Sequence, residues 1–321
     1  MRAVRFHRTG GPEVLQVDEV PVPEPGPGEV RVQVERAGLN YIDTYLRSGL
    51  YDPGQLPVVA GKEGAGRVDR LGPGVRRMAE GDRVAFFDAR GGYAERVVHA
   101  EARLLPLPDG LSSTLGAALP LQGMTAHYLT QTIRPLAQGD TILVHAAAGG
   151  VGHLAVQMAR HAGATVFGTC GSAEKAERLR ILGVDHVIRY DEEDFVERVL
   201  EGTGGRGVDL AIDGVGRATF AGTVRATRVR GHVVLFGQAS GPVAPFRPRE
   251  VLGSRTLTTA TLFDYTRDRE ELIGHAHDVF GWALEGKLEV WIDRILPLEE
   301  AGHAHRLLEN RQTSGKVLLE P

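Results

Sequence analysis

Short strand-like runs alternate with turns in the first part of the chain, up to about residue 121. Polar and apolar residues alternate in the run 29–34, and the run 82–86 ends in consecutive apolar residues. Turns rich in Gly and Pro, such as 25–28 and 72–74, separate these runs. Short strands divided by such turns are typical of a small, irregular all-β barrel, and we expect one here.

From about residue 122, the pattern changes to strands and helices in turn. The strands are expected at 141–145, 164–169, 185–189, 208–212 and 232–236, and the helices at 151–162, 173–182, 193–201 and 217–228. This alternation predicts a parallel sheet with helices on both faces. Beyond it, we expect a further strand at 255–262, a helix at about 268–285 and a short strand at 314–319.

The turn between the first strand and the first helix of this region has the sequence AAAGGVG, residues 146–152. A strand, a Gly-rich turn and a helix in this order form a phosphate cradle, because the helix start offers unpaired N–H groups and a partial positive charge. Ala147, Gly149 and Gly152 occupy the three positions of an altered G-x-G-x-x-G motif. A plain Gly-rich turn is the alternative, but the flanking strand and helix favour a dinucleotide site.

The end of the second strand distinguishes between the two nicotinamide dinucleotides. An NAD enzyme often has Asp or Glu there to bind the ribose 2′-OH, whereas this chain has the neutral segment 169–173, followed by Glu174 and Lys175. The missing carboxylate and the nearby cation favour a 2′-phosphate, and therefore NADPH over NADH. Tyr190, at the end of the third strand, could lie over the same pocket and either stack there or donate a hydrogen bond to the phosphate. The alternatives are a solvated Lys175 and an ordinary amphipathic tyrosine.

Two later turns, DGVG at 213–216 and FGQ at 236–238, follow the fourth and fifth strands. Ligands of open parallel sheets lie outside the carboxyl ends of the strands, so both turns are expected to line the nicotinamide half of the cofactor. Taken alone, each turn is better explained as an ordinary loop, because glycine is common in turns.

The composition narrows the class of protein. The chain has 321 residues, 42% of them hydrophobic and 24% charged, which is enough for a sizeable core and two domains. A formal net charge of -4 without a basic block does not suggest nucleic acid as a main partner. Cys170 is the one cysteine, which excludes an intramolecular disulfide and a multi-cysteine metal cluster. Without a long apolar run or a signal-peptide pattern, we expect a soluble, cytoplasmic protein with no membrane contact.

Five segments together resemble the medium-chain dehydrogenase/reductase superfamily, and within it the zinc-free, zeta-crystallin-like NADPH:quinone oxidoreductases. They are FHRTGGPEVLQ (6–16), LNYIDTYLRSGLY (39–51), GKEGAGRV (61–68), HAAAGGVG (145–152) and GTCGSAEK (168–175). The resemblance implies a GroES-like β-barrel substrate domain at 1–121 and 263–321. It implies a Rossmann-type, doubly wound parallel sheet at 122–262, and an NADPH-dependent reductase that is usually a homodimer.

The same resemblance bears on zinc. Zinc-dependent relatives use a Cys and a His of the first domain as catalytic ligands, and many add a four-cysteine lobe. This chain has Asn40 in place of that Cys and Lys62 in place of that His, and the lobe is absent. The pairs His275/His277 and His303/His305 are two residues apart and would face different sides of a helix. We therefore expect no metal.

By motif, the resemblance also implies which residues form the site. Asn40 and Asp43 would contact the nicotinamide end, while Tyr45 and Tyr51 would line the acceptor pocket. The alternative for Asn40 and Asp43 is a simple helix-entry cap. The residues implied to bind the cofactor are Thr125, Gly149, Gly150, Val151, Gly171, Ser172, Lys175, Tyr190, Val215, Phe236, Gly237, Gln238, Thr261 and Lys316.

Without a metal to polarise a carbonyl, such a reductase suits acceptors that are already electrophilic. We expect NADPH-dependent reduction of quinones, with positioning as the main catalytic contribution. An enone or acyl-CoA double-bond reductase is the enzyme alternative. A nucleotide-binding, crystallin-like or RNA-binding protein is the alternative from another class. Departures from relatives at Gln122 and at 259–260 leave the acceptor open, and the strand at 255–262 is expected to pair two subunits.

Overall fold

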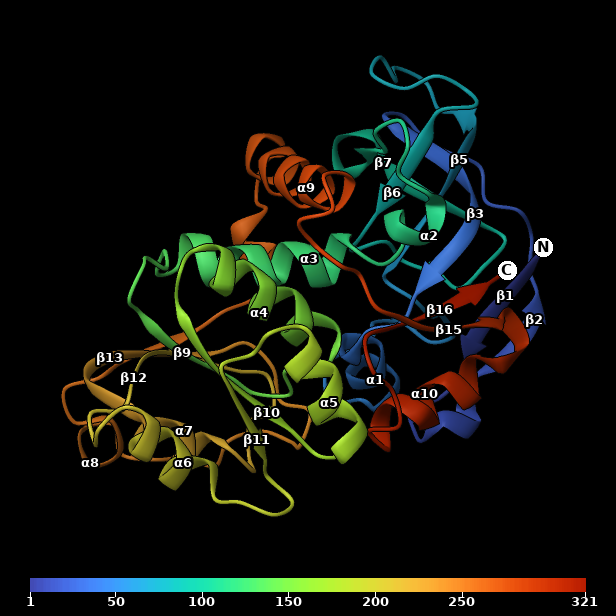
Figure 1. Cartoon of the computed structure of the whole chain (residues 1–321). Helices are drawn as coiled ribbons and strands as arrows, with labels where there is room; N and C mark the ends of the chain where they lie inside the picture. Colours follow the sequence, from blue (N-terminus) through green and yellow to red (C-terminus); the bar gives the residue numbers. More distant parts are fainter. The chain divides into compact units, whose positions relative to one another are not determined.

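The computed structural model describes all 321 residues, and they form two compact units (Figure 1). Unit 1 consists of Met1–Gln122 and Thr266–Pro321, so both ends of the chain belong to it. Unit 2 is the continuous segment Gly123–Tyr265. Helix α3, Pro120–His127, carries the chain from unit 1 into unit 2.

Unit 2 is built on a six-stranded sheet whose neighbouring strands are all parallel. The strand order is β11-β10-β9-β12-β13-β14. The chain enters this sheet at β9 in the middle, adds β10 and β11 on one side, and then adds β12, β13 and β14 on the other, which confirms the predicted Rossmann-type sheet. The strands are β9 Thr141–Val144, β10 Thr165–Cys170, β11 His186–Arg189, β12 Val208–Asp213, β13 Thr227–Leu235 and β14 Thr256–Thr259.

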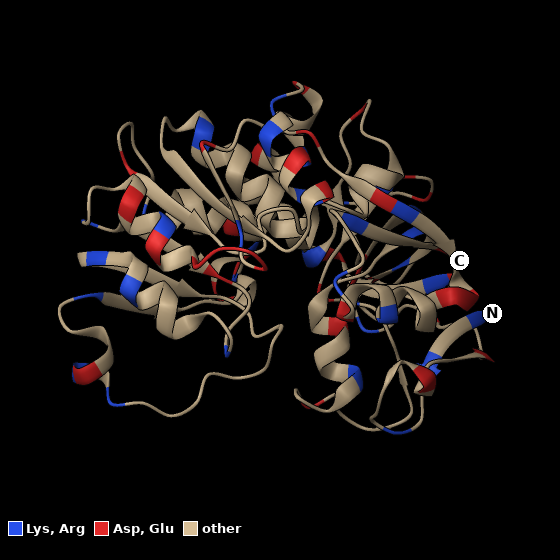
Figure 2. Ribbon diagram, turned by 60° about the horizontal axis from the view of Figure 1, so that its bottom comes forward, with Lys and Arg blue, Asp and Glu red and all other residues tan.

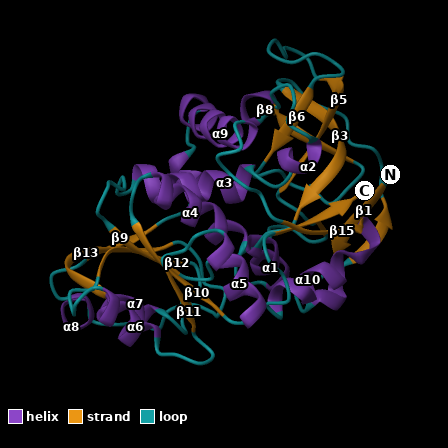
Figure 3. Ribbon diagram, viewed as in Figure 1, coloured by secondary structure: helices purple, strands orange, loops and turns teal.

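Helices follow the strands of unit 2 at or near the positions that the hydrophobic pattern predicts (Figure 3). They are α4 Gly150–His161, α5 Ala173–Ile181, α6 Phe195–Gly202, α7 Phe220–Ala226 and α8 Pro248–Leu252, with the π-helix η3 Tyr128–Thr132 and the 3-10 helix η4 Leu262–Tyr265. Two helix starts are capped by side chains, because Ser172 accepts from the Lys175 N–H at 3.2 Å and Asp194 accepts from the Val196 N–H at 2.7 Å.

Two element boundaries in unit 2 differ from the expectation. The helix expected to reach residue 228 ends at Ala226, and β13 begins at Thr227. Tertiary contacts explain this early start, since Thr227 pairs with Val208 and the Arg228 guanidinium binds Asp209. The strand expected over 255–262 is limited to β14, and a 3-10 turn begins at Leu262.

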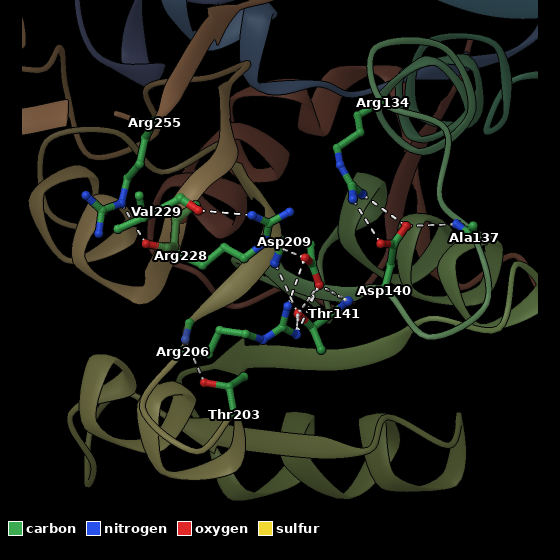
Figure 4. Close-up of polar contacts among 12 residues, drawn as sticks. Arg134, Ala137, Asp140, Thr141, Thr203, Arg206, Asp209, Arg228, Val229 and Arg255 are labelled. Atoms are coloured by element: carbon green, nitrogen blue, oxygen red, sulfur yellow. Dashed lines mark hydrogen bonds and ion pairs between the residues drawn. The ribbon is translucent and has the colours of Figure 1, made fainter. Parts of the chain in front are cut away.

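A buried carboxylate holds the amino ends of β9 and β12 together (Figure 4). Asp209 accepts hydrogen bonds from the backbone and hydroxyl of Thr141 at 2.9 and 2.7 Å, and from Arg228 Nε at 2.5 Å. Arg206 adds a contact at 3.2 Å. Burial alone would raise the pKa of Asp209, but these hydrogen bonds outweigh it and hold that pKa well below its usual value. The network fixes the sheet at the end opposite to the Gly-rich turn.

Unit 1 contains two sheets, which come from both ends of the chain. A three-stranded sheet has the order β2-β1-β4, and a seven-stranded sheet has the order β15-β16-β3-β5-β6-β8, with β7 paired to β3. The strands are β1 Arg2–Phe6, β2 Gln16–Glu19, β3 Glu29–Gly38, β4 Val58–Val59, β5 Glu63–Leu71, β6 Arg83–Phe86, β7 Arg96–Ala100, β8 Leu105–Pro106, β15 Ile292–Pro297 and β16 Lys316–Glu320. The expected GroES-like β-structure is confirmed.

The C-terminal segment completes the sheet of unit 1. Strand β16 pairs antiparallel with β3, with Leu318 opposite Gly38, and parallel with β15. Strand β15 and helix α10 are absent from the sequence expectation, although Ala301, Ala304 and Leu307 of α10 recur at helical spacing and are buried. The helices of this unit are α1 Tyr41–Ser48, α2 Ser113–Gly116, α9 Arg269–Leu284 and α10 Ala301–Glu309, with the 3-10 helices η1 Pro12–Val14, η2 Glu101–Arg103 and η5 Leu298–Glu300.

The charged residues are interspersed along the ribbon rather than separated by sign (Figure 2). Many of them form ion pairs close to the surface, such as Arg2 with Glu95 and Arg134 with Asp140. No helix combines the length and the apolar character that crossing a membrane requires.

Candidate active site

The Gly-rich turn of unit 2 connects β9 to α4. Gly149 precedes the first turn of α4, and Ala146 adopts a left-handed backbone with φ of 49°. The turn is anchored to β10, because the Ala147 N–H donates to the Thr169 carbonyl at 2.8 Å. A Cβ atom at Gly152 would lie 2.3 Å from the Ala146 carbonyl oxygen, so only glycine lets the helix pack this closely on the turn. Gly149, Gly150 and Val151 thus form the helix start, where backbone N–H groups are free of intrahelical partners.

The residues predicted to recognise the 2′-phosphate come together at the end of β10. Ser172 caps α5, and the half-buried Lys175 lies in the first turn of that helix. Tyr190 packs over Gly171, because a Cβ atom at Gly171 would lie 2.2 Å from the Tyr190 hydroxyl. Tyr190 is 42% exposed and its backbone N–H donates to the Cys170 carbonyl at 3.1 Å. Gly171, Ser172, Lys175 and Tyr190 therefore belong to one corner of unit 2.

The turns after β12 and β13 also lie side by side. The backbone N–H groups of Ala239 and Ser240 donate to the carbonyls of Gly214 and Val215, at 3.1 and 2.8 Å. A Cβ atom at Gly237 would lie 2.7 Å from the Gly214 carbonyl oxygen, so the two turns touch at glycine. Val215, Phe236, Gly237 and Gln238 are brought together as the sequence predicts.

A buried carboxylate shapes the turn after β12. Asp213 is fully buried and accepts hydrogen bonds from the backbone N–H groups of Val215 and Gly216, at 2.8 and 3.0 Å. It also accepts from the hydroxyls of Thr219 and Thr223, each at 2.8 Å. Of the other two predicted cofactor residues in unit 2, Thr125 is buried in α3 and Thr261 is exposed beside η4.

In unit 1, Asn40 lies at the centre of a buried polar cluster. Its side-chain NH2 donates to Glu63 Oε2 at 2.8 Å and to the Gly38 carbonyl at 3.3 Å. Its side-chain oxygen accepts from Lys316 Nζ at 2.9 Å and from Gln122 Nε2 at 3.1 Å. All four hydrogen-bonding positions of the amide are therefore used within unit 1, and they fix its orientation.

Glu63 and Lys316 form an ion pair inside this cluster, and both side chains are fully buried. Glu63 also accepts from the Leu121 N–H at 2.6 Å, at the start of α3. A Cβ atom at Gly38 would lie 2.5 Å from Glu63 and 2.9 Å from the Lys316 side chain, so a glycine is required beside the pair. Burial lowers the pKa of Lys316, and the adjacent carboxylate opposes that shift.

Asp43 lies beside the cluster in the first turn of α1. Its Oδ2 atom accepts from the Asn40 backbone N–H at 2.9 Å and from the Tyr93 hydroxyl at 3.0 Å. Its other oxygen, Oδ1, is buried without a hydrogen-bond partner. Burial raises the pKa of Asp43 to about 7, although both hydrogen bonds act in the opposite direction. The helix-entry cap is thus present, and it involves a carboxyl that titrates near neutral pH.

The two predicted acceptor-site tyrosines are neighbours. The rings of Tyr45 and Tyr51 meet edge to face, with centroids 5.2 Å apart. Tyr45 is buried, whereas Tyr51 is 40% exposed. Tyr41 extends the group, since its ring centroid lies 6.1 Å from that of Tyr45. A cluster of three tyrosine rings, inclined to one another, therefore borders the surface of unit 1 here.

The residues at the expected zinc-ligand positions do not fit zinc. Asn40 is engaged by four partners, and the Lys62 ammonium lies 3.3 Å from Asp88. Glu63, the carboxylate that accepts from the Asn40 side chain, is already paired with the Lys316 ammonium. No group of three or more His, Cys, Asp or Glu side chains is arranged to hold a metal ion.

Several residues of these clusters escape sequence reasoning. Glu63 and Tyr93 belong to unit 1, whereas His145, Thr169 and Thr223 connect the turns of unit 2. Glu63 is the one with a usable signal, because a carboxylate inside the run GKEGAGRV needs a partner when it is buried. The others have no local pattern that separates them from ordinary core residues.

Comparisons with known proteins show which family the chain belongs to. The family described as alcohol dehydrogenase GroES-like domain matches residues 26–109, and the family described as zinc-binding dehydrogenase matches residues 150–277. A quinone oxidoreductase of Pseudomonas aeruginosa is 41% identical over 323 residues, which cover 100% of this chain and 99% of the relative. A 2-haloacrylate reductase of a Burkholderia species is 39% identical over 328 residues, which cover 99% of this chain and 98% of the relative.

The fold agrees with this assignment. The crystal structure of Escherichia coli quinone oxidoreductase complexed with NADPH matches with a TM-score of 0.97 at 38% identity, and the match covers 100% of both chains. Full-length similarity at this level extends to the Gly-rich turn and to the segment around Asn40. The chain belongs to the zeta-crystallin-like quinone oxidoreductases of the medium-chain dehydrogenase/reductase superfamily.

Proposed function

We propose that this protein is an NADPH:quinone oxidoreductase. The observation that carries the proposal is the corner at the end of β10, where a strand end without a carboxylate meets Lys175, Ser172 and Tyr190. Full-length similarity to quinone oxidoreductases, one of them solved with NADPH, supports both the cofactor and the reaction.

Unit 2 is assigned to the cofactor. The pyrophosphate is assigned to the α4 start, Gly149, Gly150 and Val151, where the positive end of the helix dipole lies. The N–H groups of Gly150 and Val151 are the donors there, because the Gly149 N–H donates to the Ala146 carbonyl at 2.8 Å. Lys175 and Tyr190 bind the 2′-phosphate. The remaining contacts are assigned to Thr125, Gly171, Ser172, Val215, Phe236, Gly237, Gln238 and Thr261. When bound, NADPH supplies the reducing equivalent, and the protein contributes binding and orientation.

Unit 1 is assigned to the acceptor. Tyr45 and Tyr51 place two neighbouring aromatic rings there, and the more exposed ring of Tyr51 can pack on a flat molecule such as a quinone. Asn40, Asp43 and Lys316 form a polar cluster in the same unit, and by motif Asn40 and Asp43 are assigned to the nicotinamide end of the cofactor and Lys316 to the cofactor as well. Because the Asn40 amide and the Lys316 ammonium are held by Glu63, their orientation is set before any ligand binds. Hydride acceptance by a quinone also consumes a proton, and the residues as arranged do not single out its donor.

A double-bond reductase is the second candidate. The 2-haloacrylate reductase relative favours it, since its substrate has a carbon–carbon double bond next to a carboxylate. The two functions are separated by measuring NADPH oxidation with 1,4-naphthoquinone, an aliphatic enone and an enoyl-CoA. Turnover with the quinone well above that with either double-bond substrate supports the proposal, and the reverse order assigns the protein to the double-bond reductases.

We also propose a homodimer that forms through β14. This strand is at the end of the six-stranded sheet, and its exposed Thr256 and Thr259 border an edge that a second copy can pair. Light scattering of the wild type is expected to give a dimer, and Thr256→Lys with Thr259→Lys is expected to shift it toward monomer. Ile181→Lys is the control, because Ile181 is 78% exposed at the end of α5, which follows β10 at the other side of the sheet.

The cytoplasmic location and the lack of a nucleic-acid partner stay predictions. A net charge of -4 and interspersed charges favour the latter (Figure 2). Binding to RNA with a steep dependence on salt would contradict it.

A further inference from the structure

A buried path of hydrogen bonds connects the two turns of unit 2 to which the halves of the cofactor are assigned. It begins at Ala146, in the Gly-rich turn after β9, and ends at Asp213, the last residue of β12, which accepts from the turn that follows. His145, Thr169 and Thr223 lie between them, and all three are at most 3% exposed. None of these three residues is among the groups assigned to the cofactor, so the proposed function leaves them without a role.

Each link of this hydrogen-bond path has a normal length. The Ala146 N–H donates to Thr169 Oγ1 at 3.2 Å, and Thr169 Oγ1 lies 3.2 Å from His145 Nδ1. His145 Nε2 lies 2.9 Å from Thr223 Oγ1, which donates to Asp213 Oδ2 at 2.8 Å. Asp213 then accepts the N–H groups of Val215 and Gly216. The path thus runs from one ligand-facing turn to the other without a gap.

The hydrogens along the path have one arrangement that satisfies every group. The Thr223 hydroxyl oxygen lies 2.8 Å from Asp213 Oδ2 and 2.9 Å from the Thr219 carbonyl oxygen. Both oxygens can only accept, so the Thr223 hydroxyl hydrogen points to them and Thr223 must accept from His145 Nε2–H. His145 Nδ1 is left with a lone pair and accepts from the Thr169 hydroxyl, whose oxygen accepts from the Ala146 N–H. Burial lowers the pKa of His145, which keeps the ring neutral as this arrangement requires.

The path also stabilises an unfavourable backbone conformation at Ala146. Ala146 has φ of 49°, a left-handed conformation that a residue with a Cβ atom rarely adopts. Its N–H bond to Thr169 fixes this conformation. The ring of Phe195 packs edge-on against the His145 ring, with centroids 4.8 Å apart, and limits rotation of the imidazole.

We propose that His145 is a positioning residue that, through Thr169 and Thr223, sets the spacing between the pyrophosphate turn and the nicotinamide turn. It binds no part of NADPH itself. A cofactor that bridges both turns gains affinity from their fixed spacing, whereas a fragment that occupies one turn does not. The inference rests on the assignment of both turns to NADPH.

The test compares the affinity for NADPH with the affinity for 2′,5′-ADP, a fragment that carries only the adenosine side. The variants are Thr169→Val, Thr223→Val and His145→Phe, which keep side-chain shape and remove links. Each variant is expected to bind NADPH about three- to tenfold more weakly than the wild type, while its affinity for 2′,5′-ADP changes by less than about twofold. Thr130→Val is the control, because Thr130 is buried in unit 2 and bonds the carbonyl of its own helix at 2.8 Å. Unchanged NADPH affinity, or an equal loss for both ligands, overturns the inference.

A double-mutant cycle separates positioning from independent damage. Either threonine substitution cuts the same path, so the double variant Thr169→Val/Thr223→Val is expected to lose about as much NADPH affinity as one single variant. Losses that simply add overturn the inference. Nitrogen NMR gives a second readout: His145 is expected to be protonated at Nε2 and unprotonated at Nδ1, and the opposite tautomer contradicts the path.

The same experiments distinguish this inference from the proposed function. A wild type that binds NADPH but does not reduce quinones overturns the function alone. A wild type that does not bind NADPH overturns both.

Discussion

Lys316 donates a hydrogen bond to the side-chain oxygen of Asn40 at 2.9 Å, although 276 positions separate the two residues in the sequence. Lys316 begins the C-terminal strand β16, and Asn40 follows β3, with which β16 pairs. Both contact the buried carboxylate of Glu63. The first and last parts of the chain are therefore joined at one polar cluster, and that cluster orients the Asn40 amide and the Lys316 ammonium.

The buried ion pair is expected to matter most for stability when only one partner is removed. Lys316→Met leaves Glu63 charged and without its cation, and we expect the free energy of unfolding to fall by about 3–5 kcal/mol. Adding Glu63→Gln to this variant removes the stranded charge and is expected to restore part of the loss. Urea denaturation measures both changes. A double variant that loses the sum of the two single losses would show that the pair is not coupled.

Asp43 is expected to make stability depend on pH. Because burial raises its pKa from 3.8 to about 7, the native state keeps a proton that the unfolded chain releases between these values. The unfolded state binds fewer protons there, so this carboxyl lowers stability as the pH rises from about 4 to about 7, by up to ~1.4 kcal/mol per pH unit. Above about 7 the effect is constant.

Two variants isolate this effect in urea denaturation at pH 5 and pH 7. The side chain of the Asp43→Asn variant cannot titrate. The stability of the wild type relative to this variant is therefore expected to be lower at pH 7 than at pH 5. Tyr93→Phe removes a hydrogen bond that lowers the pKa of Asp43, and is expected to extend the slope to higher pH. A difference between the wild type and Asp43→Asn that does not change with pH would contradict the shifted pKa.

Lys175 is expected to determine the preference for NADPH. Lys175→Ala should lower the affinity for NADPH about ten- to a hundredfold, because one charge-assisted contact is lost. The affinity for NADH should stay nearly unchanged. Fluorescence titration of both cofactors measures this. Arg180→Ala is the control, since Arg180 lies in the same helix and pairs with Glu177 at the surface. Equal losses for NADPH and NADH would remove the role in binding the 2′-phosphate.

Gly152 is expected to tolerate no side chain. A Cβ atom there would lie 2.3 Å from the Ala146 carbonyl oxygen and 2.8 Å from the Ala147 Cα, and both belong to backbone that cannot move aside. Gly152→Ala should therefore cost about 1–3 kcal/mol of stability and weaken NADPH. Gly274→Ala is the matched control, because that helical glycine has nothing within 4 Å of a Cβ atom and should gain up to ~1 kcal/mol. Similar results for both variants would contradict the close packing of α4 on the turn.

The Gly-rich turn before α4 and the start of α5 could be located from the sequence because their signals are local. A strand, glycines at fixed spacing and a helix mark the turn before α4, and the neutral strand end with Lys175 follows at the expected distance. The parallel sheet follows from the alternation of strands and helices, which is also a local pattern. The helix boundary near residue 228 was wrong because the pairing of Thr227 with Val208 and the contact of Arg228 with Asp209 override local preference.

The polar clusters could not be predicted, because their members meet only in the folded chain. Glu63, Tyr93 and Lys316 come from separate strands and loops, and neither the run around Glu63 nor the resemblance that names Lys316 predicts that these side chains meet. The same holds for His145, which follows β9, and Asp213, which ends β12; they are joined through Thr223. The resemblance gave Asn40 and Asp43 their place in the site, but the buried partners that orient them appear only in the structure.

The specificity constant for reduction of 1,4-naphthoquinone, measured with NADPH and with NADH on the same preparation, tests the central claim most directly. We expect turnover with NADPH and a specificity constant at least about tenfold higher than with NADH, because one charge-assisted contact distinguishes the two cofactors. No turnover with the quinone, or equal specificity constants for both cofactors, would contradict the assignment as an NADPH:quinone oxidoreductase.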